Sequence, residues 1–182
     1  MSKITNIRNT IRSNMENCVN PIVDYTALYR AAEIDVGIRE WRPSWEPGDS
    51  RELAGLMYKQ MMWVYLWRTI YPPKTTTWQP EYKITEVVND GLDLMKRFPP
   101  KSQVQTLLLA PTFLIGCAAF DPAQRPTIRQ SIANIKAYTH LRNADRAVEV
   151  LEEVWRYMDA KDERSWDWQM VAHSMGMDFL AT

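Results

Sequence analysis

The hydrophobic pattern of the chain is dominated by one stretch, residues 107–120, in which Thr112 carries the only hydroxyl group. A helix that is apolar on every side is buried, and this run is shorter than the about 20 residues that a membrane-spanning helix needs. We therefore expect it to form the central helix of a core, capped by Ser102 and ending near Phe120. Pro111 has no backbone N–H to donate, so the helix should kink or break near this residue.

A second stretch, residues 61–67, is also apolar on every face and reads Met-Met-Trp-Val-Tyr-Leu-Trp. It lies within a predicted helix from about Ser50 to Tyr71, which follows the potential N-cap Asp49 and ends before two prolines. Because a helix without a polar face must be covered by its neighbours, we expect this helix to pack beside the central one.

The remaining segments place apolar residues at helical spacing and are separated by prolines and capping residues. The stripe within residues 21–41 consists of Ile22, Tyr25, Leu28, Tyr29, Ala32 and Val36. Similar stripes predict helices over residues 2–17, 81–98, 126–139, 144–158 and 168–175, and no segment shows the alternation of a strand. The sequence thus predicts an all-α fold, a single globular domain of about seven to eight helices around a buried, proline-kinked central helix. Residues 1–20 are expected to be an N-terminal arm or short helix, and residues 21–182 the helical domain.

Composition and charge exclude several kinds of partner. The 22 basic and 22 acidic side chains balance, so no electrostatic footprint points to nucleic acid or to an anionic membrane. No apolar stretch is long enough to span a bilayer. Two cysteines, Cys18 and Cys117, do not make a disulfide framework and are typical of a reducing compartment. We therefore expect no direct nucleic-acid binding by this chain and no membrane association.

No motif for catalysis or metal binding stands out. His140 and His173 lack the paired Cys or His spacing of a zinc site, and Cys117 lies in the most apolar segment, where a nucleophilic thiolate is not stabilised. The acidic residues within 159–163 are interrupted by Lys161 and are typical of a solvated loop. We expect no catalytic residue, no metal and no cofactor, and we interpret the chain as a non-enzyme.

One kind of binding site remains a hypothesis, namely an apolar pocket beside the central helix. A helix that breaks at Pro111 can leave a concavity next to the aromatic residues of the helix over 50–71, although a packed core is the simpler interpretation. The candidate ligand-contacting residues are Trp63, Trp67, Phe113 and Gly116.

Two blocks of sequence carry a family resemblance. Residues 107–125 contain a Leu-rich run, a proline, Phe-Leu-Ile-Gly-Cys-Ala-Ala, and then Asp and Arg. Residues 143–155 contain Asn, a spaced Ala and Leu-Glu-Glu-Val-Trp, and Asp167-Trp168 follows. In this order and spacing the blocks resemble the fungal-specific transcription factor domain, the regulatory region C-terminal to the binuclear zinc cluster of many fungal transcription factors. The resemblance implies a regulator in the nucleus whose partners are other proteins of the transcription machinery or a homodimer partner.

The chain departs from that family in lacking the six closely spaced cysteines of the zinc cluster. It therefore does not read DNA by that route, and we expect either the C-terminal part of a longer factor or a shortened family member. Three hypotheses on function follow. The favoured one is a regulatory, effector or protein-interaction domain. The alternatives are a receptor domain that binds an apolar metabolite such as a sterol, as in some relatives, and an all-helical enzyme that acts on a hydrophobic substrate.

Overall fold

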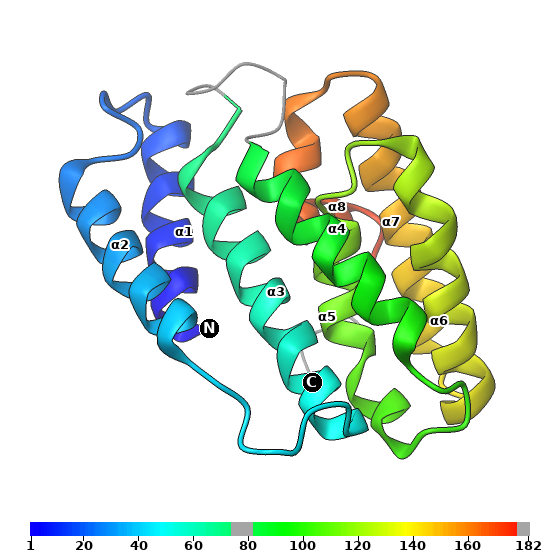
Figure 1. Ribbon diagram of the computed structural model, residues 1–182. Coiled ribbons are helices and arrows are strands. Elements are labelled where there is room, and N and C mark those ends of the chain that lie inside the picture. The colour runs from blue at the N-terminus through cyan, green and yellow to red at the C-terminus, as the bar shows by residue number, and fades with distance from the viewer. Residues whose placement is uncertain (74–81, 178–182) are drawn as a thin grey trace.

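The computed structural model of the protein describes residues 1–73 and 82–177. The segment Lys74–Pro80, which follows two prolines and for which the sequence predicts a loop, lies outside the described residues. Within the described part there are eight α-helices and three short 3₁₀ helices, and no strand. The predicted all-α fold with a single globular domain is confirmed (Figure 1). The elements are α1 (Ser2–Glu16), α2 (Tyr25–Glu40), α3 (Ser50–Ile70), α4 (Tyr82–Arg97), η1 (Gln103–Leu107), α5 (Leu109–Gly116), η2 (Pro122–Gln124), α6 (Arg125–Thr139), α7 (Asn143–Asp159), η3 (Glu163–Trp166) and α8 (Trp168–Ser174).

The apolar stretch around Pro111 forms the centre of the fold, and the break expected near this proline is confirmed. The chain runs as the 3₁₀ helix η1 up to Leu107, and the α-helix α5 starts only at Leu109. Pro111 therefore lies in the first turn of α5, where a missing N–H costs nothing because helix starts have unpaired N–H groups anyway. The α-helix is shorter than predicted, since it ends at Gly116 and not near Phe120.

The long helix α3 lies beside α5, as its apolar centre predicted, and also packs against α1, α2 and α4 (Figure 1). Asp49 caps its start by accepting a hydrogen bond from the Arg51 N–H at 2.7 Å. The main hydrophobic core is built from α3, α4, α5, α6, α7 and α8. Because α3 also borders the smaller cluster shared with α1 and α2, it joins the two ends of the bundle.

Glycines let the central helices approach closely. A Cβ atom on Gly91 of α4 would stand 2.8 Å from Ile115 Cδ1, and one on Gly116 would stand 2.9 Å from Leu151 Cδ2. The carbonyl of Gly116 also accepts a hydrogen bond of 2.8 Å from the indole Nε1 of the fully buried Trp155. The space between α4 and α5 is thus filled by Ile115 of α5, and the space beside Gly116 by side chains of α6 and α7.

The N-terminal helix α1 is packed into the fold. Its residues Ile4, Ile7 and Ile11 are buried. The buried Arg8 guanidinium donates a hydrogen bond of 2.6 Å to the Trp166 carbonyl and lies over the Trp166 ring, 4.0 Å from its centroid. Burial lowers the pKa of Arg8, and nearby Asp167 opposes this shift. These contacts hold α1 against η3.

Helix α2 forms within the predicted segment 21–41 but starts only at Tyr25, after the N-cap Asp24, and its apolar stripe faces solvent. The stripe residues Tyr25 and Tyr29 are 88% and 70% exposed, and the buried residues are instead Ala27, Ala31 and Ile38. Two small alanines let α2 lie close to its neighbours, and the Asp35 carboxylate accepts a hydrogen bond of 2.9 Å from the Trp63 Nε1 of α3. These contacts fix the rotation of α2 about its own axis.

Candidate functional site

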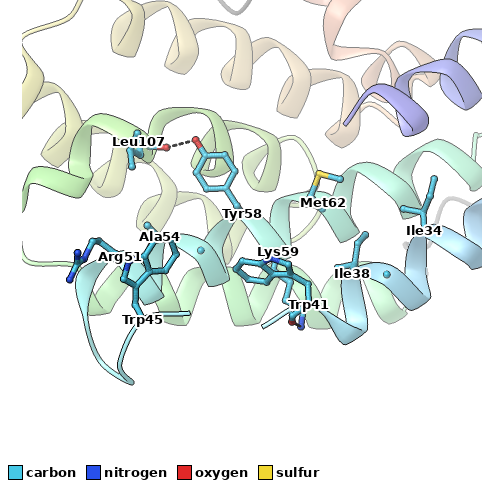
Figure 2. Close-up of a pocket in the computed structure, with 12 residues that line it drawn as sticks. Ile34, Ile38, Trp41, Trp45, Arg51, Ala54, Tyr58, Lys59, Met62 and Leu107 are labelled. Carbon is cyan, nitrogen blue, oxygen red and sulfur yellow. Dashed lines mark hydrogen bonds between the residues drawn. The ribbon is translucent and has the colours of Figure 1, made fainter. Parts of the chain in front are cut away.

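An open apolar groove of about 670 Å³ lies on the surface of α3 (Figure 2). It is bounded by the end of α2, the loop that follows it, the first half of α3 and the end of η1. We call it the tryptophan groove. Its lining residues are Ile34, Gly37, Ile38, Trp41, Trp45, Arg51, Ala54, Gly55, Tyr58, Lys59, Met62 and Leu107.

Large side chains line this groove and remain in contact with solvent. Trp41 and Trp45 are 43% and 41% exposed, Tyr58 is 37% exposed and Leu107 is 53% exposed. They come from three segments that are distant in the sequence and lie on one face (Figure 2). A concentration of exposed large apolar residues on one patch is typical of a binding surface, whereas single exposed ones are ordinary.

Lys59 fixes the wall of the groove formed by Trp41, because it joins α3 to the end of α2. Its ammonium donates hydrogen bonds to the carbonyls of Arg39 at 3.2 Å and Trp41 at 2.9 Å. The Arg42 guanidinium donates to the same two carbonyls. Burial, with a contribution from the nearby Arg42 charge, lowers the pKa of Lys59. Two cations therefore satisfy the free carbonyls at the C-terminus of α2, as the helix dipole favours, and hold Trp41 in place.

Tyr58 links the groove to the break at Pro111. Its hydroxyl donates a hydrogen bond of 2.9 Å to the Leu107 carbonyl, which is the carbonyl that a residue with an N–H at position 111 would contact in a continuous helix (Figure 2). Because Pro111 has no N–H, this carbonyl is available to Tyr58. Partial burial raises the pKa of the Tyr58 hydroxyl further above neutral pH, where a tyrosine hydroxyl is already protonated and able to donate.

Gly55 leaves space on the surface of α3 for the ring of Trp41. A Cβ atom at this position would stand 2.9 Å from Trp41 Cη2 and 3.7 Å from Trp45 Cζ3. The loop that carries the two rings reaches α3 because Pro43 and Pro47 direct its course and Gly48 takes a positive φ of 88°. The groove therefore depends on a glycine in a helix, where this residue otherwise lowers helix stability.

The four residues predicted as pocket candidates lie in two other places. Trp63 and Trp67 border a separate depression of about 310 Å³ that also contains charged side chains such as Asp35 and Glu86. Phe113 is fully buried, with its ring 5.2 Å from that of Trp168 in an edge-to-face arrangement. Gly116 lies against Leu151 in the packed core. The structure thus does not bring the four residues together around one cavity, and their contact with a ligand stays a prediction.

Sequence reasoning missed the groove residues because they lie in a loop and on exposed helix faces. The signal available was the segment Trp41-Arg-Pro-Ser-Trp45-Glu-Pro-Gly, in which two tryptophans stand in a polar, proline-directed loop. A tryptophan in such a loop either packs on the domain or offers a contact to a partner. Which helix lies beneath the loop is a tertiary property that this segment does not encode.

The described residues show little reactive chemistry. Within residues 1–73 and 82–177, no three His, Cys, Asp or Glu side chains gather as a potential metal site. Cys117 is buried, and burial raises the pKa of its thiol to about 12, which keeps it protonated and a poor nucleophile. No helix within residues 1–73 and 82–177 is long and apolar enough to cross a membrane.

The described part of the chain is thus a helical bundle with a solvent-open apolar groove on α3. Comparison with known families identifies the bundle: the fungal specific transcription factor domain matches residues 1–182, and the chain belongs to this family. The resemblance noted in the sequence is thereby confirmed. No curated protein and no solved structure matches the chain. Membership implies a regulatory role in a fungal transcription factor, regulatory partners and a place in the nucleus, and it suggests a non-enzymatic protein.

Proposed function

We propose that this chain is a regulatory domain that binds an apolar segment of another protein of the transcription machinery in the tryptophan groove. The observation that carries the proposal is the convergence of Trp41, Trp45, Tyr58 and Leu107, all more than a third exposed, on one apolar groove. Tryptophan, tyrosine, methionine and arginine are enriched at protein interfaces, and all four residue types line this groove.

The openness of the groove favours a protein partner over a small metabolite. Pockets for small molecules bury about 70–90% of the ligand surface. The rings of Trp41 and Trp45 lie at the solvent boundary, so the groove covers one side of an occupant and leaves the other side free. A side chain or helix of a larger partner meets this requirement because its own fold covers the outer side.

One observation, the volume of the groove, favours the alternative that the chain is a receptor for an apolar metabolite. Its volume of about 670 Å³ falls within the range of roughly 300–1,000 Å³ that ligand pockets occupy. The enzyme alternative has less support, because the ionisable side chains lining the groove are Arg51, Tyr58 and Lys59, without a carboxylate or a histidine. An apolar metabolite such as a sterol is therefore the competing occupant.

A matched pair of leucine variants tests the proposal. Leu107 in the groove and Leu141 before α7 are 53% and 56% exposed, so truncating either one removes a similar exposed surface. The chain is fused to a heterologous DNA-binding module, and reporter transcription is compared with that from the module alone. We expect Leu107→Ala to lose most of the change in transcription and Leu141→Ala to keep it. The backbone carbonyl that Tyr58 contacts is retained in both. Equal output from the two variants would refute the proposal.

A second measurement separates the two occupants. The purified chain is heated with and without ergosterol, and native mass spectrometry is used to detect lipid carried through purification. The protein-binding proposal predicts an unchanged unfolding temperature and a mass equal to that of the chain alone. A sterol-dependent rise in unfolding temperature that Leu107→Ala abolishes would replace the proposal with the receptor function.

A further inference from the structure

Helices α3 and α4 lie side by side (Figure 1), and two depressions adjoin each other along the boundary between them. One, of about 250 Å³, contains Gln60 and Asp90. The other, of about 310 Å³, contains Trp63, Trp67, Glu86 and again Asp90. Because Asp90 belongs to both, we treat them as one site and call it the α3–α4 cleft. It shares no lining residue with the tryptophan groove.

Two carboxylates at the centre of the α3–α4 cleft lack a cationic partner. Asp93 is paired with Lys96 at 2.9 Å, whereas Glu86 and Asp90 take part in no ion pair among the described residues. Burial raises the pKa of Asp90, and the neighbouring carboxylates of Glu86 and Asp93 raise it further. Carboxylates that repel one another without a compensating charge favour the binding of a cation between them.

The Gln60 side chain adds a buried acceptor at the same place. Gln60 is 9% exposed, and its Oε1 has no hydrogen-bond partner in the described part of the chain. A buried acceptor without a donor is unfavourable, so this atom indicates a donor that comes from outside the chain. Leu56 and Leu94 line the same depression and offer apolar surface beside the acceptors. A long cationic side chain, with an aliphatic stem and a polar head, matches this combination.

We infer that the α3–α4 cleft binds one arginine side chain of a partner protein, with its guanidinium between the Asp90 carboxylate and Gln60 Oε1. A guanidinium presents five N–H donors in a rigid plane, so it can pair with a carboxylate and donate to a second acceptor at the same time. The indole rings of Trp63 and Trp67 border the cleft, and such rings attract cations. The ammonium of Lys83 already lies 4.9 Å from the centroid of the Trp67 ring.

The charges along α4 limit the ligand to a single central cation. The helix carries Lys83, Glu86, Asp90, Asp93 and Arg97 in this order, so a basic residue stands at each end of the acidic centre. A segment rich in lysine and arginine would therefore meet like charges at both ends. Glu86 and Asp90 are exposed, so the cleft covers only one side of an occupant. A side chain carried by a larger partner suits this openness better than a small molecule, which needs enclosure on most sides.

NMR titration of the isotope-labelled whole chain tests the inference. The probe is Nα-acetyl-L-arginine amide, in which both backbone groups are capped as they are within a protein. We expect saturable shifts of the Asp90 and Gln60 signals, with a dissociation constant of roughly 1–20 mM for a single side chain. The citrulline derivative has nearly the same shape without the charge and should leave these signals unchanged. Equal shifts with both probes, or no shift up to about 100 mM arginine derivative, would overturn the inference.

Matched variants test the role of the named side chains. Asp90→Asn should weaken binding of the arginine derivative at least about fivefold. Glu149→Gln, which removes an exposed carboxylate of α7, should leave binding unchanged. Gln60→Leu should weaken binding while the unfolding midpoint stays the same or rises, because a buried acceptor without a donor is removed. Binding by Asp90→Asn that equals the wild type would overturn the site, and circular dichroism confirms that each variant remains helical.

Two further probes test the identity of the ligand. A lysine derivative with the same caps should bind more weakly, and equal or tighter binding would overturn the choice of a guanidinium. Free arginine should bind no more tightly than the capped derivative. Tighter binding of free arginine would overturn a partner protein as the source of the side chain. None of these measurements involves the tryptophan groove or its reporter assay, so the two proposals can fail independently.

Discussion

Gly116→Ala tests the packing of the central helix most sharply. The added methyl group would stand 2.9 Å and 3.1 Å from the two Cδ atoms of Leu151 and 3.2 Å from Ile128 Cγ2, and both of these neighbours are fully buried. Overfilling a packed core costs about 1–3 kcal/mol, and replacing Gly by Ala in a helix returns at most about 1 kcal/mol. Because Gly116 is the last residue of α5, the returned part is small. The expected net loss of unfolding free energy is about 1–2 kcal/mol.

Thermal unfolding followed by circular dichroism measures this loss. In a chain of this length each kcal/mol corresponds to about 2–4 °C, so the midpoint should fall by about 2–8 °C. Gly37→Ala is the control, since Gly37 lies within α2 and has no atom within 4 Å of its would-be Cβ. The control should raise the midpoint slightly, because it restores helix propensity without a clash. An unfolding midpoint for Gly116→Ala equal to that of the wild type, or raised as in Gly37→Ala, would refute the packing argument.

Two further predictions concern the same core. Trp155→Phe removes the 2.8 Å hydrogen bond from Nε1 to the Gly116 carbonyl and leaves a space where the larger ring stood. Urea unfolding should therefore show that the free energy of unfolding falls by about 1–3 kcal/mol. A decrease below about 0.5 kcal/mol would contradict this prediction. In a thiol-reagent titration, the exposed Cys18 should react at once. The buried Cys117, whose pKa is raised to about 12, should react only in denaturant. Two rapidly reacting thiols would contradict the burial of Cys117.

The positions of the helices could be predicted from the sequence because they depend on local signals. Prolines, capping residues such as Asp49, and apolar residues at helical spacing act within a few residues of the helix ends. The break at Pro111 is of the same kind, since it follows from one missing N–H. The predicted length of the central helix was wrong. Helix α5 ends at Gly116, because the residues after it form turns that lead into η2.

The rotation of α2 could not be predicted, because the helix carries apolar residues on two sides. Tyr25 and Tyr29 follow helical spacing, and so do Ala27, Ala31 and Ile38. Contacts distant in the sequence decide between the two sides, among them the hydrogen bond from Trp63 to Asp35. Hydrophobicity alone favours burying the larger residues, and the close approach that alanines allow was not visible in the pattern.

The groove stayed hidden for a related reason. Its walls come from α2, the loop after it, α3 and η1, and these segments meet only in the folded chain. The prediction instead placed a pocket beside α5, where the apolar character of the sequence is highest. There the side chains of Ile115 and Leu151 fill the available space. High apolar content therefore indicated the core, whereas the candidate site lies where large apolar residues are only partly covered.

We propose that the tryptophan groove carries the regulatory activity of this domain. The most direct measurement is the reporter output of the DNA-binding fusion in which Trp41 and Trp45 are both replaced by Ala. A Leu141→Ala/Met170→Ala fusion, which loses two residues that are each 56% exposed and lie outside the groove, is the control. Removing interface anchors worth at least about 1 kcal/mol weakens binding about fivefold or more. We predict that the tryptophan variant loses most of the regulation and the control keeps it; equal regulation by both at equal protein levels would contradict the claim.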